Sequence, residues 1–132
     1  MHDVTSDTAL HLDRYVAAWN EADPDRRRAA VDRLYAENGL LVTPSVQVRG
    51  REAILEHIGE VLAEFVGSSG QRFRCTASTR NHGGFLLRWE LTGDGQPATA
   101  SGVIALLLGP DGRIVIDNQF GEPLSDDGGT ER

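Results

Sequence analysis

The chain has 132 residues, a net charge of −7 at neutral pH and one cysteine, Cys75. This length suits one domain with its own core, and a lone cysteine excludes an intramolecular disulfide. Nucleic acids and anionic membranes are poor partners for so acidic a chain, because binding their phosphates requires a basic face. We therefore expect a single globular domain that binds neither nucleic acid nor a membrane.

The first half of the sequence predicts three helices, with two short strands between the second and the third. Apolar residues recur at spacings of three and four, the period of an amphipathic helix, and Asp25 is a candidate cap of the second helix. The helices are expected at residues 8–21, 26–35 and 52–65, and the short strands at residues 39–43 and 45–48.

The second half changes to the two-residue period of β-strands. Four long strands are expected at residues 71–80, 85–92, 98–108 and 113–120, joined by loops and turns rich in glycine, serine, asparagine and aspartate. Helices that are separate from an antiparallel meander predict an α+β domain of two layers. This domain is expected to span residues 8–121, between a flexible N-terminus at residues 1–7 and a disordered acidic tail at residues 122–132.

One strand of the predicted sheet is apolar on both of its faces. It contains residues 103–108, the longest apolar run of the chain. One face packs on the helices, and the other face also needs a cover, for which a second copy of the chain is the simplest choice. We therefore expect a homodimer that forms through the outer face of the sheet.

Other classes of site are disfavoured by what the sequence lacks. The chain does not open with a basic segment and an apolar run, and no apolar run approaches the roughly 20 residues of a membrane span, so we expect a cytoplasmic protein. No two histidines have the spacing of metal ligands, and no glycine-rich loop opens a helix after a strand. We expect neither a bound metal nor a cofactor.

Four segments carry a family resemblance: residues 14–20 (RYVAAWN), 34–39 (LYAENG), 49–54 (RGREAI) and 111–114 (DGRI). Together with the order of the elements, they resemble the nuclear transport factor 2-like superfamily, in particular its SnoaL-like and ketosteroid-isomerase-like branch. The resemblance implies a cone: a curved antiparallel sheet with three N-terminal helices packed on its concave face, around a pocket. It also implies frequent homodimers. Members include isomerases, polyketide cyclases, epoxide hydrolases, dehydratases and binding proteins without catalytic activity.

Steroid-type isomerisation is disfavoured by the residues at three positions. The resemblance implies a carboxylate base and an oxyanion hole made by a tyrosine and a protonated aspartic acid. Tyr15 matches the tyrosine, but Thr43 and Ile104 occupy the two carboxylate positions. A threonine hydroxyl is no base on its own, and isoleucine donates no hydrogen bond, so only one part of that site is present.

Three polar residues are the candidate catalytic groups: Tyr15 as a donor, His57 as a base and Asn118 as an orienting group. His57 lies on the apolar stripe of the third helix, the face that the resemblance directs into the pocket, and imidazole titrates near neutrality. A packed histidine bonded to a carbonyl explains the same position. We favour this second interpretation, because the sequence identifies no partner that would orient the ring.

The face on which Asn118 lies depends on the register of the last strand. Asn118 alternates with Ile116 and Phe120 and is expected to share their face. There it would fix a ligand carbonyl or satisfy a neighbour across the sheet, and we leave both interpretations open. A slip of the pairing by one residue would bring Asp117 into the pocket instead.

The expected pocket suits a small apolar organic ligand. Its walls are expected to be formed by Trp19, Thr43, Phe85, Trp89, Ile104 and Phe120. Aromatic walls are normal in ligand pockets, and aromatic side chains are equally normal in a core. The sequence indicates a pocket protein, expected to be a cofactor-independent isomerase, cyclase or dehydratase that transfers protons on an apolar metabolite. The alternatives are a non-catalytic ligand-binding protein and a dimerising accessory domain.

Overall fold

A computed structural model describes residues 4–67 and 70–121 of the chain. It contains three α-helices, a short π-helical segment and six strands. The helical elements are α1 (Val4–Ala18), α2 (Pro24–Leu34), α3 (Arg51–Val61) and the π-helix η1 (Leu62–Gly67). The strands are β1 (Tyr35–Val42), β2 (Gln47–Arg49), β3 (Arg72–Asn81), β4 (Gly84–Thr92), β5 (Ala100–Leu108) and β6 (Ile114–Gly121).

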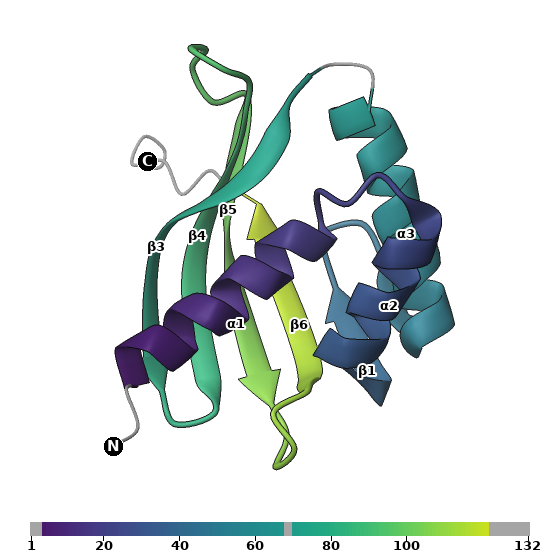
Figure 1. Cartoon of the computed structure of the whole chain (residues 1–132), viewed down its shortest axis with the longest axis vertical. Coiled ribbons are helices and arrows are strands. Elements are labelled where there is room, and N and C mark those ends of the chain that lie inside the picture. Colours follow the sequence, from purple (N-terminus) through teal and green to yellow (C-terminus); the bar gives the residue numbers. More distant parts are fainter. Residues whose placement is uncertain (1–3, 68–69, 122–132) are drawn as a thin grey trace, which may run out of the picture.

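The six strands form one sheet in the order β2-β1-β6-β5-β4-β3. All neighbours are antiparallel except β1 and β6, which run parallel. The α1 helix crosses one face of the twisted sheet, and α2 and α3 lie together beside β1 (Figure 1). The α+β prediction is therefore confirmed, and the sheet and helices form the cone typical of nuclear transport factor 2-like folds.

The core fills the space between the helices and the concave face of this sheet. Its buried apolar side chains come from every α-helix and from β1, β4, β5 and β6, and they include Leu12, Leu34, Leu41, Ile54, Ile58, Leu87, Leu106 and Ile114. None of the helices among the described residues is long and apolar enough to cross a membrane.

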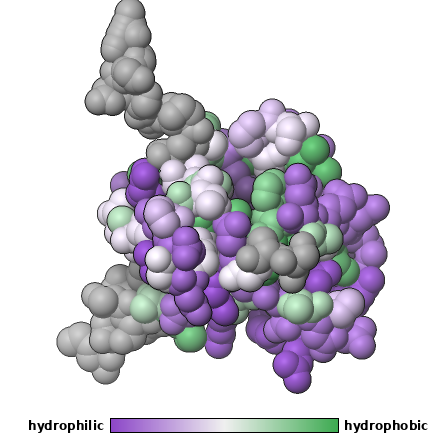
Figure 2. Space-filling view, turned by 90° about the horizontal axis from the view of Figure 1, so that it is seen from above, coloured by the Kyte–Doolittle hydropathy of each residue, from purple (hydrophilic) through white to green (hydrophobic). Residues whose placement is uncertain are grey.

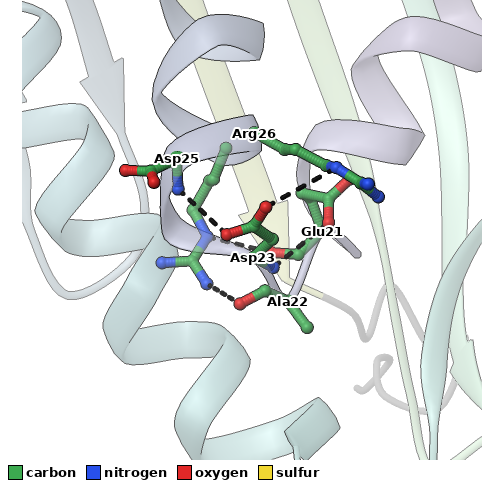
Figure 3. Close-up of polar contacts among 6 residues, drawn as sticks. Glu21, Ala22, Asp23, Asp25 and Arg26 are labelled. Atoms are coloured by element: carbon green, nitrogen blue, oxygen red, sulfur yellow. Dashed lines mark hydrogen bonds and ion pairs between the residues drawn. The ribbon is translucent and has the colours of Figure 1, made fainter.

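The start of α2 differs by two residues from the prediction. Asp23, and not Asp25, is the cap: its Oδ1 accepts a hydrogen bond of 3.3 Å from the Asp25 backbone N–H, and Pro24 occupies the first helical turn (Figure 3). Proline suits that position because its missing N–H would have no partner there. An ion pair of 3.5 Å between Arg26 and Asp23 also lies at this helix start (Figure 3).

The end of α2 also differs, and the difference matters for the site. The helix stops at Leu34, and Tyr35 adopts extended backbone angles (φ −106°, ψ 142°) as the first residue of β1. Its side chain is completely buried. A tyrosine that the sequence assigned to a helix therefore projects from a central strand into the interior.

A side chain fastens the segment after α1 to the edge of the sheet. The Asn20 amide donates to the backbone carbonyl of Phe73 and accepts from the backbone N–H of the same residue, both at 2.8 Å. These bonds satisfy two backbone groups of the edge strand β3, which has no further strand beside it. They also fix Phe73 close to the neighbouring Trp19, whose ring centroid lies 6.3 Å from that of Phe73.

A β-bulge in β6 decides which residues of that strand face the helices. Leu107 pairs with Ile116 and Leu108 pairs with Ile114, so Val115 is an extra residue in β6. One inserted residue reverses the alternation of side chains between the two faces of the sheet. The residues before and after Val115 therefore do not follow a single alternating pattern. Ile114 is buried on the core side, and three positions later Asp117 is also buried.

The bulge places Asp117 and Gln119 on the inner face and leaves Asn118 and Phe120 on the outer face. Asn118 lines a groove on the outside of the sheet, and the Phe120 side chain is 51% exposed. The prediction that these two residues face the pocket is therefore wrong. The stated alternative, in which Asp117 turns inward, matches the structure, although the cause is a bulge and not a slip of the whole strand.

Candidate functional site

A cavity of about 440 Å³ opens between α1, the end of α3 and the concave face of the sheet. This volume lies within the range of small-molecule pockets. Most of its wall is apolar and includes Val16, Trp19, Val61, Phe73, Leu87 and Trp89. Hydrophobic surface lies between hydrophilic regions at the end of the molecule seen from above (Figure 2). The polar side chains on the wall are those of Tyr15, Thr43, Ser45, His57, Glu64, Arg74 and Gln119.

One cluster of polar groups, here called the polar corner, consists of Tyr15, Tyr35, Asp117 and Gln119. Asp117 Oδ2 accepts hydrogen bonds from the Tyr15 hydroxyl at 2.9 Å and from the Tyr35 hydroxyl at 2.6 Å. Gln119 Nε2 donates to Asp117 Oδ1 at 3.2 Å and to Tyr15 Oη at 3.0 Å. Tyr15 and Gln119 line the cavity, and Asp117 and Tyr35 lie behind them. The Asp117 carboxyl group is thus connected to the cavity by its hydrogen bond with Tyr15, whose side chain lines the cavity.

Burial sets the protonation behaviour of the polar corner. Burial raises the pKa of Asp117 to about 6, and the hydrogen bonds from Tyr35, Tyr15 and Gln119 offset part of that rise. Burial, together with the nearby Asp117 carboxylate, raises the pKa of each of the two phenols well above its ordinary value. Asp117 is therefore the group of this cluster that gains and loses a proton near neutral pH.

His57 is a further titratable residue on the cavity wall, which also includes Glu64 and Arg74. Its side chain is 15% exposed, and its ring meets that of Trp19 edge to face with centroids 6.1 Å apart. Burial lowers the pKa of the imidazole, and the Glu60 carboxylate, 4.0 Å from Nδ1, partly offsets this. The imidazole is consequently neutral at physiological pH and is able to accept a proton.

Aromatic rings in edge-to-face contact form one side of the cavity. Phe73 lies between Trp19 and Trp89, with ring centroids 6.3 Å and 5.6 Å away. The Trp89 indole covers Gly102, where a Cβ atom would lie 2.7 Å from Trp89 Nε1. Gly102 therefore provides the room in which this ring sits. Among the buried side-chain N and O atoms of the described residues, Trp89 Nε1 alone has no hydrogen-bond partner.

The structure brings most of the predicted pocket residues together. The predicted residues that line the cavity are Tyr15, His57, Trp19, Thr43, Trp89 and Ile104. Phe85 does not: it is buried at the other end of the core, where its ring contacts His11 and the Arg80 guanidinium. Thr43 uses its hydroxyl oxygen to accept from the backbone N–H groups of Ser45 and Val46, which shapes the turn after β1.

Three members of the polar corner are not predicted by the sequence. Tyr35 falls in the predicted second helix, Asp117 enters the prediction only as the outcome of a slip, and Gln119 is not among the candidate site residues. The preference of β-strands for tyrosine is the one local feature that favours a strand at Tyr35. No local signal reveals the bulge that turns Asp117 and Gln119 inward.

A metal centre is not evident in the part of the chain that the structure describes. Within residues 4–67 and 70–121, no group of three histidine, cysteine, aspartate or glutamate side chains is arranged to hold a metal ion. The polar corner and His57 offer hydrogen bonding and proton transfer to a ligand in the cavity.

A curved sheet that wraps around a helix-covered pocket defines a nuclear transport factor 2-like protein. The family model of the SnoaL-like domain matches residues 12–116, and the chain belongs to this family. No curated protein matches the chain.

Solved structures show the same fold. A candidate isomerase of the SnoaL-like family from Agrobacterium tumefaciens is 28% identical, with 89% of this chain and 99% of that chain covered and a TM-score of 0.80. A candidate SnoaL-like polyketide cyclase from Jannaschia is 14% identical over 86% of both chains, with a TM-score of 0.66. A candidate polyketide cyclase from Sinorhizobium meliloti is 16% identical, with coverages of 89% and 99% and a TM-score of 0.67. The last two likenesses concern the fold alone.

Proposed function

We propose that the protein is a cofactor-independent enzyme that transfers protons on a small apolar metabolite, in an isomerisation, cyclisation or dehydration. One observation carries the proposal. The buried Asp117 carboxyl group, whose pKa burial raises to about 6, accepts a hydrogen bond from the hydroxyl of Tyr15, and Tyr15 lines the apolar cavity. A general acid–base group works best when its pKa is close to the working pH. The family includes proteins described as isomerases and polyketide cyclases, which agrees with this class of reaction.

The polar corner and His57 supply the two proton-transfer sites that such a reaction requires. The neutral His57 imidazole takes a proton from a carbon next to a ligand carbonyl, and the C–H electron pair becomes the C=C bond of an enol. The carbonyl oxygen takes the proton of Tyr15, and Asp117, in its acid form, returns a proton to Tyr15 Oη over 2.9 Å. The His57 imidazolium then protonates a different carbon, the enol oxygen gives its proton back to Tyr15 as the carbonyl re-forms, and Tyr15 returns its proton to Asp117, which completes an isomerisation.

The active form carries a proton on Asp117 and none on His57. The pKa of Asp117 is raised to about 6, and that of His57 is lowered from 6.5. In more alkaline solution both groups lose their protons, and in more acidic solution both are protonated. We therefore expect the rate to fall as the pH rises through about 6, where Asp117 loses its proton, and to fall again in acid solution, where His57 becomes protonated.

Hydrogen–deuterium exchange tests the chemistry without knowledge of the natural substrate. The protein is incubated in D₂O with a panel of aromatic and alicyclic ketones, and deuterium gain next to the carbonyl is measured by mass spectrometry. Tyr15→Phe, Asp117→Asn and His57→Gln should each lower the rate about 10²–10⁴-fold. Asn118→Ala, on the outer face of the sheet, is the matched control and should exchange like the unmodified protein.

Two outcomes of this experiment contradict the proposal. One is exchange that survives Asp117→Asn and Tyr15→Phe, which would exclude the polar corner from the chemistry. The other is an absence of exchange across the panel when calorimetry shows that ketones bind. That result would favour the second candidate function, a non-catalytic ligand-binding protein. The position of Asp117 behind the cavity wall favours that alternative, since the carboxyl group does not line the cavity.

The outer face of the sheet supports the further proposal of a homodimer. It exposes large apolar side chains next to one another, Leu86 at 47% on β4 and Leu107 at 48% on β5, and β6 adds the exposed Phe120. Light scattering on the purified chain should give twice the monomer mass, and Leu107→Lys should reduce it to the monomer. A monomer at micromolar concentration would contradict this proposal.

A further inference from the structure

The hydrogen-bond directions within the polar corner are determined by its members. Tyr35 Oη accepts from Trp19 Nε1 at 3.4 Å, and an indole N–H is only a donor. The Tyr35 hydroxyl proton therefore goes to Asp117 Oδ2, its other partner. Both N–H bonds of Gln119 Nε2 are also used, one toward Asp117 Oδ1 and one toward Tyr15 Oη.

These directions determine what Tyr15 offers to the cavity. With Asp117 ionised, Tyr15 donates its only proton to the carboxylate and accepts one bond from Gln119. A lone pair on Tyr15 Oη then remains for a ligand, and no proton does. A ligand that meets this oxygen must bring the proton itself.

Gln119 adds a second acceptor beside the first. Because its N–H groups point to Asp117 and Tyr15, the orientation of the amide is fixed, and its carbonyl Oε1 has no hydrogen-bond partner among the described residues. This oxygen is also not among the buried atoms that lack a partner, so it is accessible, in a side chain that lines the cavity. The polar corner thus presents two acceptors to a ligand.

The other groups that face Asp117 do not change this assignment of donors and acceptors. They are the phenols of Tyr15 on α1 and Tyr35 on β1 and the amide of Gln119 on β6 itself. Across the described part of the chain, no charged side chain pairs with the carboxylate. Its protonation state alone therefore determines whether Tyr15 acts as an acceptor or a donor.

We infer that the polar corner, with Asp117 ionised, selects an aromatic or enolic ligand through a hydroxyl donor, a phenol or an enol, over the corresponding ketone or ether. The edge-to-face rings of Trp19, Phe73 and Trp89 favour an aromatic skeleton. When Asp117 gains a proton, it donates to Tyr15 Oη, both acceptor sites of that oxygen are filled, and the Tyr15 proton turns to the cavity. The preference then changes to the carbonyl.

This inference rests on the proposed use of the cavity as a binding site, and it does not require catalysis. Calorimetry compares three ligands with the same ring system: 2-naphthol, 2-methoxynaphthalene and 2-acetylnaphthalene. At about pH 8, where Asp117 is ionised, 2-naphthol should bind at least about tenfold more tightly than the ether and the ketone. At about pH 5 the affinity for the ketone, relative to the affinity for 2-naphthol, should rise by a similar factor.

Variants separate the hydroxyl contact from the fit of the rings. Tyr15→Phe should remove most of the preference for 2-naphthol and leave the affinity for the ether unchanged, and Asn118→Ala should change neither. Equal binding of the three ligands at about pH 8, or no binding of any of them, would overturn the inference. Selective 2-naphthol binding without any deuterium exchange on ketones would contradict the proposed enzyme and support this inference.

Discussion

Replacing Asp117 by asparagine should flatten the dependence of stability on pH. The pKa of this carboxyl group is 3.8 in an unperturbed setting and about 6 in the folded protein. The folded state therefore holds its proton more tightly than the unfolded state. The stabilisation that results is complete below pH 3.8 and is lost as the pH rises through 6. The difference in pKa corresponds to about 3 kcal/mol of unfolding free energy.

Urea unfolding followed by tryptophan fluorescence measures this contribution directly. The free energy of unfolding is determined for the unmodified protein and for Asp117→Asn at several values between about pH 4 and pH 8. The difference between the two proteins should shift by about 2 kcal/mol over this interval, with the unmodified protein losing stability relative to the variant as the pH rises. Asp94→Asn, at an exposed turn between β4 and β5, controls for the loss of one formal charge.

A pH-independent difference between the unmodified protein and Asp117→Asn would refute the reasoning. It would mean that the carboxyl group has the same pKa in the folded and unfolded states and hence is not held in a dry interior. A shift in the opposite direction would refute it too, because it would require the folded protein to favour the carboxylate.

Three further predictions test the walls and supports of the site. Gly102→Ala should lower the unfolding free energy by about 1–3 kcal/mol, because the added methyl group would lie 2.3 Å from a backbone carbonyl oxygen of β6. The control is Gly93→Ala, whose methyl group would meet no atom closer than 3.8 Å. Equal losses of stability in the two variants would contradict this packing. Asn20→Ala should lower the unfolding free energy by about 1–3 kcal/mol. It should also speed hydrogen exchange at the Phe73 amide of β3, which donates to Asn20, and unchanged exchange would exclude that hydrogen bond. NMR titration should give His57 a pKa below 6.5, and Glu60→Gln should lower it further, while a rise in the variant would contradict the assigned causes.

Most of the architecture followed from the sequence because it depends on local patterns. The alternation from Phe85 to Leu91 and the glycine-rich turns at residues 93–96 and 109–112 predict a meander, and the structure contains it. The spacing of Tyr15 and Trp19 places both on one face of a helix, and both line the cavity. These features need no knowledge of distant partners.

The polar corner could not be predicted because it depends on pairing between distant strands. The extra residue Val115 appears only in the register of β6 against β5, and it alone turns Asp117 inward. The passage from Leu34 to Tyr35 has no glycine or proline to mark a boundary, and the parallel pairing of β1 with β6 helps to define the strand. Tertiary contacts here override a helical pattern.

The ionisation of Asp117 in the folded protein is the most direct test of the account. A carbon-13 NMR titration that follows the carboxyl carbon of Asp117 should show a midpoint at about 6. In Tyr15→Phe this midpoint should move higher, because the variant lacks a hydrogen bond that lowers the pKa. A midpoint at or below 3.8, unchanged in Tyr15→Phe, would contradict the claim that a buried carboxyl group acts on the cavity through a phenol.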